Sequence, residues 1–519
     1  MKLVSIVSIQ FCVAAVAVTT PRAYADDSSS EWFGNPMSSS SSSRLPPPPP
    51  SFSQQQDSNS IPDCSLDVFE NNGDIVRTET IIVDGCLIDC GGQPILTAVP
   101  YGSSTAVIVV RNSGHVKDCP LKLVTGSTTE DATSVPTSLV NDNEVGTTGF
   151  LCDKGDCTLT GVKCDVASEL LVFIECVLVT TGAESVTING GLVTDREKLI
   201  SLYGIVVNAG SETDEITPTV KLFVHGVTIM NQYFDGIKIL DGINTIQITD
   251  SIMSFNRRDG IEMQGGSGLK YFAIIGCTFE YNLDDGIDVG QYERNPDIGY
   301  LEEAVMEILI TDVIASFNRE DGILIERANK VTIDEVIIDG NKRTGIDIRV
   351  ANVINLQGVT SKNNAHNGFS SESIAAEISI VNSIFLTNGK DLKNSAAGMW
   401  KRSGVYIWLP KSLSITNAIS NENRMDGFCI YDCPVLNITN VDAMRNDNDG
   451  IRVRESSEAF GYDYSSGSDY LVGAYYYPWH GDDFHNGGGY LRKDLIPPQL
   501  PMLGEYDDSD RNVISQHLK

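Results

Sequence analysis

One phrase, N-x-x-D-G-I-x-I, recurs along residues 226–455 and limits the possible folds more than any other feature of the sequence. Clear copies begin at Asn256, Asn282, Asn318 and Asn446, and weaker ones surround Gly236, Gly345, Gly368, Gly404 and Gly427. The nine glycines are 24, 26, 36, 23, 23, 36, 23 and 23 residues apart, so a 23-residue unit with two insertions of 13 residues explains nearly every interval. An array of this period is typical of a solenoid, in which each unit packs on its neighbours.

Each unit alternates between apolar and polar residues as short strands do. The residue after the glycine is apolar in all nine copies, and the residue two further on is apolar in eight. A second alternating stretch follows, as at 245–248 and 330–333, and a third apolar stretch leads into the next Asn. Three such strands cannot bury their apolar faces within one unit. We therefore predict an all-β parallel β-helix with about nine clear 23-residue coils and weaker coils on the N-terminal side.

The recurring turn residues suit such stacking. Glycine would supply the positive φ of a corner, and the Asp before it, present in six of nine copies, can accept hydrogen bonds from nearby backbone N–H groups. Asn stands four residues before the glycine in seven of nine copies, and stacked coils would bring these amides about 4.8 Å apart. We expect a hydrogen-bonded Asn ladder, with both columns structural and calcium binding by stacked Asp residues as an alternative.

The repeat resembles that of right-handed parallel β-helix proteins, the pectate-lyase-like superfamily, over residues 226–455 and more weakly over 64–225. A leucine-rich repeat has a similar period but needs regular leucines, whereas these units use Ile, Val and Phe. The resemblance implies a right-handed solenoid with a groove along one strand stack, in which similar polysaccharide lyases and epimerases bind their substrates. No single enzyme family is matched, because the G-H-G and R-I-K phrases of polygalacturonases and the D-P-H-D or D-P-H-E phrase of mannuronan epimerases are absent.

Composition divides the chain into five parts. Residues 1–25 are predicted to be a secretory signal peptide, and residues 26–60, with runs of Ser and Pro, a disordered linker. Residues 61–225 form a cysteine-rich N-terminal part of the β-helix with its cap, residues 226–455 the regular repeats, and residues 456–519 a C-terminal cap. We expect a secreted, extracellular protein with no membrane span after signal cleavage, and attachment to a cell wall through the linker is an alternative.

The cysteines fit an oxidising compartment. Eight of them lie between residues 64 and 176, so up to four disulfides are predicted there. Cys86 with Cys90, and Cys152 with Cys157, are alternatively spaced as zinc ligands. In the repeats, Cys429 and Cys433 could close a small loop, which would leave Cys277 as a free thiol.

The chain carries 37 basic and 69 acidic residues, a net charge of −32. This balance argues against non-specific binding to nucleic acid or to anionic membranes. An acidic partner would need a local basic patch or a bridging cation, of which calcium is the candidate. A monomer is expected.

Outward-facing residues of the strand after each glycine define the predicted site. Consecutive coils present Lys238/Leu240, Glu262/Gln264, Asp288/Gly290, Leu324/Glu326, Asp347/Arg349, Ser370/Glu372, Tyr406/Trp408, Cys429/Tyr431 and Arg452/Arg454. We expect these side chains to point to solvent. The two insertions, near 291–303 and 390–402, flank this strand and would border a groove.

The acidic members suggest the chemistry. We select Glu262, Asp288, Asp347 and Arg349 as candidate catalytic residues. Glu262 and Asp288 should be about 5 Å apart, the spacing of a retaining glycosidase pair, while Asp288 and Asp347 are nearer the inverting spacing. Alternatively, calcium would neutralise a uronate while Arg349, Lys401 or His366 abstracts a proton. Candidate substrate-binding residues are Lys238, Glu326, Trp400, Lys401, Arg402, Tyr406, Trp408, Tyr431, Arg452 and Arg454.

Asn437 begins an N-x-T sequon and is expected to face outward, so it is the predicted glycosylation site. We expect a secreted β-helix that binds extracellular or cell-wall polysaccharide along one strand stack. Cleavage or epimerisation would make it a polysaccharide lyase, a uronan epimerase or a glycoside hydrolase. The competing prediction is a non-catalytic structural or adhesion protein of the wall or matrix.

Overall fold

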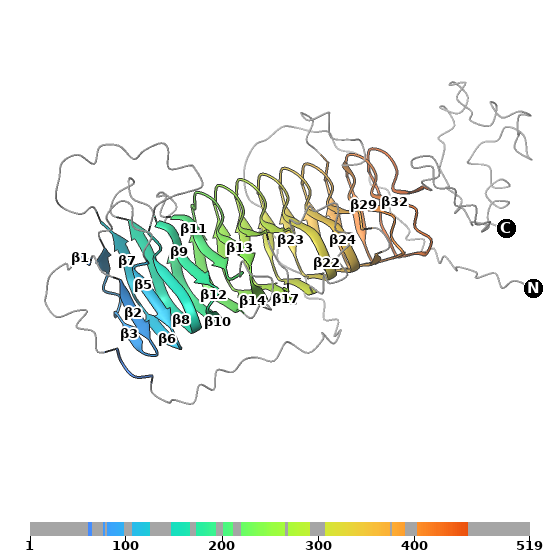
Figure 1. The fold of residues 1–519 in the computed structure, drawn as a ribbon. Coiled ribbons are helices and arrows are strands. Elements are labelled where there is room, and N and C mark those ends of the chain that lie inside the picture. The colour runs from blue at the N-terminus through green and yellow to red at the C-terminus, as the bar shows by residue number, and fades with distance from the viewer. Residues whose placement is uncertain are drawn as a thin grey trace, which may run out of the picture. The chain divides into compact units, whose positions relative to one another are not determined.

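Each repeat of the sequence forms one coil of a parallel β-helix, as the alternation of apolar residues predicted (Figure 1). In this computed structural model, the described residues are 61–64, 76–77, 80–97, 106–124, 147–166, 173–193, 201–210, 220–264, 268–290, 307–373, 376–389 and 402–454. The predicted signal (1–25), linker (26–60) and C-terminal cap (456–519) lie outside them. No helix within these ranges has the length and hydrophobicity that a membrane crossing requires.

The strands form three parallel stacks, and each regular coil adds one strand to every stack. Stack 1 contains β2 (Ile81–Asp84), β5 (Ile108–Arg111), β8 (Phe150–Val166), β9 (Phe173–Thr180), β11 (Ser201–Asn208), β13 (Ile237–Asp241), β16 (Ile261–Met263), β19 (Ile287–Val289), β22 (Ile323–Asp334), β24 (Ile346–Gln357), β26 (Phe369–Ser371), β29 (Val405–Trp408), β32 (Phe428–Tyr431) and β34 (Ile451–Arg454).

Stack 2 contains β3 (Leu87–Asp89), β6 (Gly114–Lys117), β10 (Ala183–Val193), β12 (Val220–Met230), β14 (Ile243–Thr249), β17 (Tyr271–Ile275), β20 (Glu307–Thr311), β27 (Glu377–Val381), β30 (Ser412–Thr416) and β33 (Leu436–Thr439), with parts of β8, β22 and β24. Stack 3 contains β1 (Val76–Arg77), β4 (Ile95–Thr97), β7 (Pro120–Leu123), β15 (Ile252–Ser254), β18 (Thr278–Glu280), β21 (Ile314–Ser316), β23 (Ile337–Asp339), β25 (Thr360–Lys362), β28 (Ile384–Leu386) and β31 (Ile419–Asn421), with the ends of β8, β10 and β12.

The interior is filled by one continuous column of Ile, Val, Leu and Phe side chains, which runs from Ile81 to Ile430. The largest are fully buried phenylalanines, among them Phe272, Phe279, Phe369 and Phe385. The column extends through the cysteine-rich part, so the weaker N-terminal coils that the sequence predicted belong to the same solenoid. A single shared core explains why no coil has to be stable alone.

Eight asparagines form the predicted ladder inside the turn that leads into stack 1. Each side-chain Nδ2 donates to the Oδ1 of the next Asn at 3.0 or 3.1 Å, in the order Asn256, Asn282, Asn318, Asn341, Asn364, Asn388, Asn423 and Asn446. Each Oδ1 also accepts the backbone N–H of the Asn in the previous coil. The ladder continues across sequence gaps of 36 and 35 residues, so the coils on either side of both insertions stay stacked in register.

The predicted reason for the repeat glycines is wrong. None of them has a positive φ; that conformation belongs to the residue just before the ladder Asn, such as Phe255 or Asn363. The glycines are needed for space instead, because a Cβ on Gly345 would lie 2.5 Å from the carbonyl oxygen of Gly368 and 2.8 Å from Nδ2 of Asn364. Any side chain would therefore collide with both the next coil and the ladder.

The eight N-terminal cysteines form four disulfides, Cys64–Cys86, Cys90–Cys119, Cys152–Cys157 and Cys164–Cys176, so the zinc alternative fails. The prediction for the remaining cysteines is half right. Cys277 is a free thiol as expected, but Cys429 and Cys433 are free as well. Cys429 cannot reach Cys433 easily because it lies on strand β32 with its side chain buried among the neighbours of stack 1.

We predict that Asn318→Ala lowers the free energy of unfolding by about 3 kcal/mol, because it leaves several buried polar groups of the ladder unpaired. Asn318 is fully buried and bonds to Asn341, Asn282 and the carbonyl of Phe279. Urea unfolding followed by circular dichroism measures the change. The control Asn352→Ala removes an exposed Asn–Asn bond and should change stability little. Similar effects of both substitutions would contradict a structural role for the ladder.

Candidate functional site

The candidate site is the outward face of stack 1, and the strand register confirms how the sequence aligned it. The second positions after the repeat glycines lie in one row: Lys238, Glu262, Asp288, Leu324, Asp347, Ser370, Tyr406, Cys429 and Arg452. Neighbours in the row are one strand spacing apart, about 4.8 Å. A second row lies two residues before the glycine and, in the five coils from Gly260 to Gly368, comprises Arg258, Asp284, Glu320, Arg343 and His366. We call the surface formed by these two rows and the fourth strand positions the site face.

The expectation that the row points freely into solvent is wrong for most members. Glu262 is 4% exposed and Tyr406 is 3% exposed, and the side chains of Lys238, Leu324, Ser370 and Cys429 are also buried. The reason is the close spacing of the coils, which lets side chains from the adjacent coils and from the turn row cover each member. The site face is therefore a packed layer of polar groups with few free charges.

Glu262 lies at the centre of a buried ion network. Its carboxylate is 3.1 Å from both Lys238 Nζ and Arg258 Nη2, and Gln264 Nε2 donates to it at 2.6 Å. Asp235, fully buried in the turn, lies 3.8 Å from Lys238 and 3.9 Å from Arg258. Two cations thus serve two carboxyl groups. Sequence reasoning found Lys238 and Glu262 but missed Asp235 and Arg258, which belong to the turn rather than to the strand.

The network separates the pKa values of its two carboxyl groups. Burial raises the pKa of Asp235 to about 8, and the charge of Glu262 acts in the same direction. Burial also opposes ionisation of Glu262, but its hydrogen bond with Asp235 and the charges of Lys238 and Arg258 outweigh that effect and lower its pKa. At neutral pH Glu262 is therefore the charged member and Asp235 the protonated one.

Asp288, one coil further on, has no pair of bound cations like that of Glu262. Its pKa is raised to about 7, first by burial and then by the carboxylates of Glu326 and Glu262, against the opposing charge of Arg349. Its Oδ1 is buried and has no hydrogen-bond partner among the described residues. Gly290 packs closely beside it, since a Cβ there would lie 3.6 Å from Asp288 Oδ1 and 3.3 Å from Glu326 Oε2. Asp288 is thus a carboxyl group that can exchange its proton near neutral pH.

Arg349 organises the next acidic residues. Its Nη1 is 2.5 Å from Glu326, and its Nε is 3.8 Å from Asp347. Burial raises the pKa of Asp347, while Arg349 and the hydroxyl of Ser370 favour its charged form. The register places Leu324 between Asp288 and Asp347, so these two carboxyl groups are two strand spacings apart, roughly 9.6 Å.

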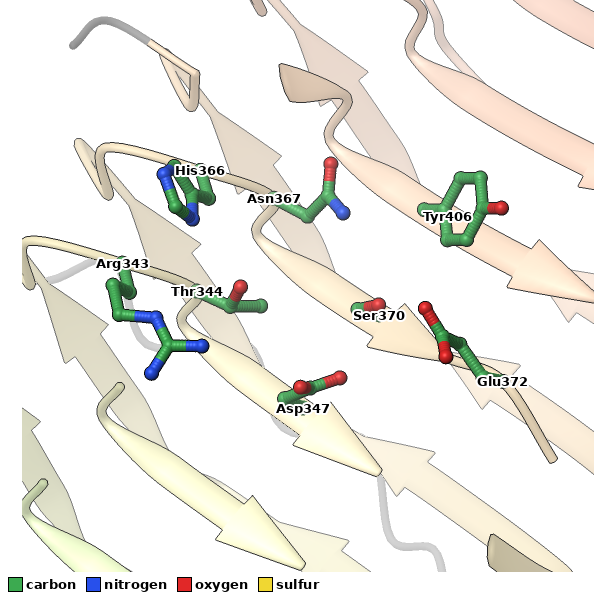
Figure 2. A pocket seen from close by; sticks show the side chains of 8 residues that line it. All are labelled: Arg343, Thr344, Asp347, His366, Asn367, Ser370, Glu372 and Tyr406. Carbon is green, nitrogen blue, oxygen red and sulfur yellow. The ribbon is translucent and has the colours of Figure 1, made fainter. Parts of the chain in front are cut away.

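A small pocket opens beside Asp347 (Figure 2). Its lining comprises Arg343, Thr344, Asp347, His366, Asn367, Ser370, Glu372 and Tyr406. Figure 2 shows that Arg343, Thr344, His366 and Asn367 come from the turns, whereas Asp347, Ser370 and Tyr406 come from the strands that follow and Glu372 lies just after β26. Arg343 also pairs with Glu320 and lies 3.7 Å from the buried Asp321. Sequence reasoning missed Arg343; its position two residues before the repeat glycine was the available signal.

The C-terminal part of the site face is aromatic, as predicted, but partly enclosed. The ring of Tyr431 lies 5.9 Å from that of Tyr406 and 6.1 Å from that of Trp408, both in tilted arrangements. Arg452 is bound by Asp426 and Asp449, which leaves Arg454 as the exposed cation at this end. Of the predicted residues on the second insertion, Arg402 is half-buried, whereas Trp400 and Lys401 lie outside the described residues. Asn437 is exposed on β33, in agreement with its predicted orientation.

The aspartates before the repeat glycines form a second ladder. Oδ1 of Asp235, Asp259, Asp285 and Asp321 each accepts the backbone N–H at the equivalent position of the next coil, at 2.5 to 3.2 Å. Burial raises the pKa of Asp259 to about 10 and that of Asp321 to about 7, and neighbouring carboxylates contribute to both shifts. The ladder is therefore largely a row of neutral acids.

Two groups of carboxyl oxygens are close enough to share a cation. In the groups Asp235–Asp259–Glu262 and Asp259–Asp284–Asp285, ligand atoms lie within 4.8 Å of one another. In the first group Lys238 and Arg258 already supply the positive charge. In the second, Asp259 and Asp285 each hold a backbone N–H of the next coil. The geometry therefore assigns no calcium ligand among the described residues, and calcium binding stays a prediction.

Comparison with known proteins agrees with the architecture. Residues 203–407 match the family model described as the right handed beta helix region. The chain folds as a right-handed parallel β-helix. Two solved structures align with it, the A-modules of the mannuronan C-5 epimerases AlgE4 and AlgE6 from Azotobacter vinelandii. Both are 12% identical over 69% of this chain; the alignments cover 88% and 86% of those chains, with TM-scores of 0.33 and 0.30. No curated protein sequence matches the chain.

We predict that the protein is more stable at mildly acidic than at alkaline pH, and that Asp321→Asn reduces this difference. An unfolded Asp loses its proton near pH 4, whereas burial keeps folded Asp321 protonated to about pH 7. The stability that this proton provides is complete below the unfolded pKa and is lost as the pH rises through the folded pKa, by at most about 1.4 kcal/mol per pH unit.

Urea unfolding of both proteins at pH 5 and pH 8 measures this effect. The wild type should lose more stability than Asp321→Asn between the two values. The matched control is Asp156→Asn, which replaces an exposed carboxylate on β8 and should behave as the wild type. Identical pH responses of all three proteins would show that the ladder carboxyls are charged in the folded chain.

Proposed function

We propose that the protein binds a polysaccharide along the site face and hydrolyses its glycosidic bonds with Asp288 and Asp347. The observation that carries this proposal is the row of carboxyl groups in register, in which Asp288 is poised to release a proton near neutral pH. General acid catalysis requires such a group, because its pKa must lie close to the working pH.

Asp288 acts as the general acid that protonates the leaving oxygen. Its buried Oδ1 has no hydrogen-bond partner among the described residues, so the proton can be directed to a bound substrate. The charged Glu262 in the preceding coil favours the protonated form of Asp288. Glu262 itself is unsuitable as a nucleophile, because Lys238, Arg258 and Gln264 hold its carboxylate. This argues against the retaining pair of Glu262 and Asp288 that the sequence suggested.

Asp347 acts as the general base. Two strand spacings, roughly 9.6 Å, separate it from Asp288, near the upper end of the separation found in inverting glycosidases. Such a gap leaves room for the sugar and for the attacking water. Arg349, 3.8 Å away, favours the charged form of Asp347 that a base needs.

The rest of the site face supplies binding contacts. The pocket of Arg343, His366 and Glu372 beside Asp347 offers hydrogen bonds to one sugar. The half-buried rings of Trp408 and Tyr431 can contact sugars further along the chain, because they lie three and four coils beyond Leu324, the residue between Asp288 and Asp347. Four disulfides fit an oxidising compartment, and secretion is part of this proposal.

We predict that Asp288→Asn lowers kcat/KM on the preferred polysaccharide by at least about 100-fold, because an amide cannot transfer the proton. In the wild type, kcat/KM should fall as the pH rises above about 7, where Asp288 loses its proton. A panel of uronans and neutral glycans, assayed for new reducing ends, identifies the substrate. Asp312→Asn is the matched control, since it changes an exposed carboxylate at a position where other coils carry Asn382 and Asn417.

The same assays separate the competing activities. Ultraviolet absorbance of unsaturated products would indicate a lyase, and exchange of the C5 proton without new reducing ends would indicate an epimerase; either result would overturn hydrolysis. Binding without any turnover, unaffected by Asp288→Asn, would support the structural or adhesion function instead.

A further inference from the structure

The outer side of the turns before stack 1 carries a second, separate surface. In four successive coils, the residue three places before the repeat glycine is exposed: Arg257, Leu283, Arg319 and Lys342. The backbone N–H of each donates to a carbonyl of the preceding coil at 2.9 or 3.0 Å, so the four positions lie in a straight row along the solenoid. Beside them lie Phe255, Tyr281 and Phe317, just before the ladder asparagines. We call these seven residues the turn ridge.

The three aromatic rings of the turn ridge form a stack. The centroids of Phe255 and Tyr281 are 5.0 Å apart with an interplanar angle of 9°, and those of Tyr281 and Phe317 are 5.1 Å apart at 13°. Tyr281 and Phe317 are each 45% exposed. Since stacked rings cover one another's faces, they present mainly their edges to solvent. The edge of an aromatic ring is its electropositive part, which favours anionic and oxygen-rich ligands.

The fold does not need aromatic residues at these positions. All three have a positive φ, of 58° to 61°, a conformation that is unfavourable for bulky side chains. Equivalent positions in nearby coils carry Asn231, Gly340 and Asn363, which adopt it at lower cost. The chain therefore tolerates backbone strain in three consecutive coils and leaves the rings of Tyr281 and Phe317 exposed. Strain that the fold does not require points to a function.

Other apolar side chains extend the same surface. Of the twelve exposed large hydrophobic side chains among the described residues, six lie between 252 and 337: Ile252, Tyr281, Leu283, Ile314, Phe317 and Ile337. The three isoleucines begin strands β15, β21 and β23 of stack 3, which lead into these turns. An exposed apolar patch of this kind, bordered by charged residues, is typical of a binding surface.

The cations of the turn ridge are available to a ligand. Within the described ranges, no ion pair involves Arg257, Arg319 or Lys342, although Arg257 lies 5.0 Å from the centre of the Tyr233 ring. By contrast, Arg258 and Arg343, one residue later in the same turns, pair with Glu262 and Glu320 of the site face. In a chain of net charge −32, three exposed cations in one row are a local exception. They complement a ligand with regularly spaced negative charges.

We propose that the turn ridge binds an acidic polysaccharide. Its carboxylates would contact Arg257, Arg319 and Lys342, and its sugar C–H groups would pack against the exposed aromatic and isoleucine side chains beside these cations. A polyuronate fits because it combines one carboxylate per sugar with apolar ring faces. The turn ridge shares no residue with the site face, so this binding does not depend on catalysis. It would hold a polymer on the protein whether or not the site face acts on it.

The test measures binding of polygalacturonate and alginate to the full chain carrying Asp288→Asn, so that turnover does not interfere. Combined Arg257→Gln, Arg319→Gln and Lys342→Gln should weaken binding by about tenfold, and added salt should weaken wild-type binding. Tyr281→Asn with Phe317→Asn should also weaken it, and Asn suits the positive φ found there. Circular dichroism and the urea midpoint check that each variant is folded.

The matched control is Arg424→Gln, which has the same place in its turn but is paired with Asp447 at 3.3 Å; its affinity should stay within about twofold of the wild type. Unchanged affinity in the triple cation variant would overturn the proposal. So would equally tight binding of polyglutamate, which has the charge but no sugar, or a dimer that Tyr281→Asn with Phe317→Asn disperses. The proposed hydrolysis is judged separately, by product formation in the wild type.

Discussion

Parallel hydrogen bonding between successive coils sets a spacing of about 4.8 Å, and every row of side chains in this protein inherits it. The Asn ladder depends on this spacing, because an amide can donate to its neighbour at 3.0 Å only when the coils repeat without slipping. The ladder in turn explains the glycines, whose missing side chains let adjacent turns and the amide groups approach. The coils that flank the two insertions keep the same spacing, since the ladder bonds continue from Asn282 to Asn318 and from Asn388 to Asn423.

The same spacing places carboxyl groups of successive coils close enough to repel one another when they are ionised. A row of aspartates or glutamates one strand apart cannot ionise fully in a buried environment, so protons or cations must be supplied. At Glu262 the solution is a pair of cations, Lys238 and Arg258. In the Asp ladder it is protonation, and at Asp288, where neither compensation is complete, the pKa moves to about 7. A group of this kind is what acid catalysis uses, and it arises here directly from stacking.

Neighbouring residues of one turn thus differ in whether their charges are paired within the protein. The residue two places before the glycine pairs with acids of the protein, as Arg343 does with Glu320 and Asp321. The residue one place earlier faces outward, as Arg319 and Lys342 do, and its charge is available to a partner. A chain with a large net negative charge can therefore contact anionic polymers through a narrow basic row without changing its overall electrostatics.

The sequence by itself determined the repeat, the three strands per coil, the Asn ladder and the residues that share a row on stack 1, because these follow from periodicity. Register is a consequence of period, so the repeat alone was enough to align Glu262, Asp288, Leu324 and Asp347. Only the tertiary structure decided which of these side chains are exposed and which are buried or held in ion pairs. Burial of Glu262 and Tyr406, the pairing of Asp235 with residues of the next coil, and the free thiols of Cys429 and Cys433 depend on packing across coils. Periodicity predicts which way a side chain points. The environment that sets its charge, however, comes from neighbouring coils, whose residues lie far away in the sequence.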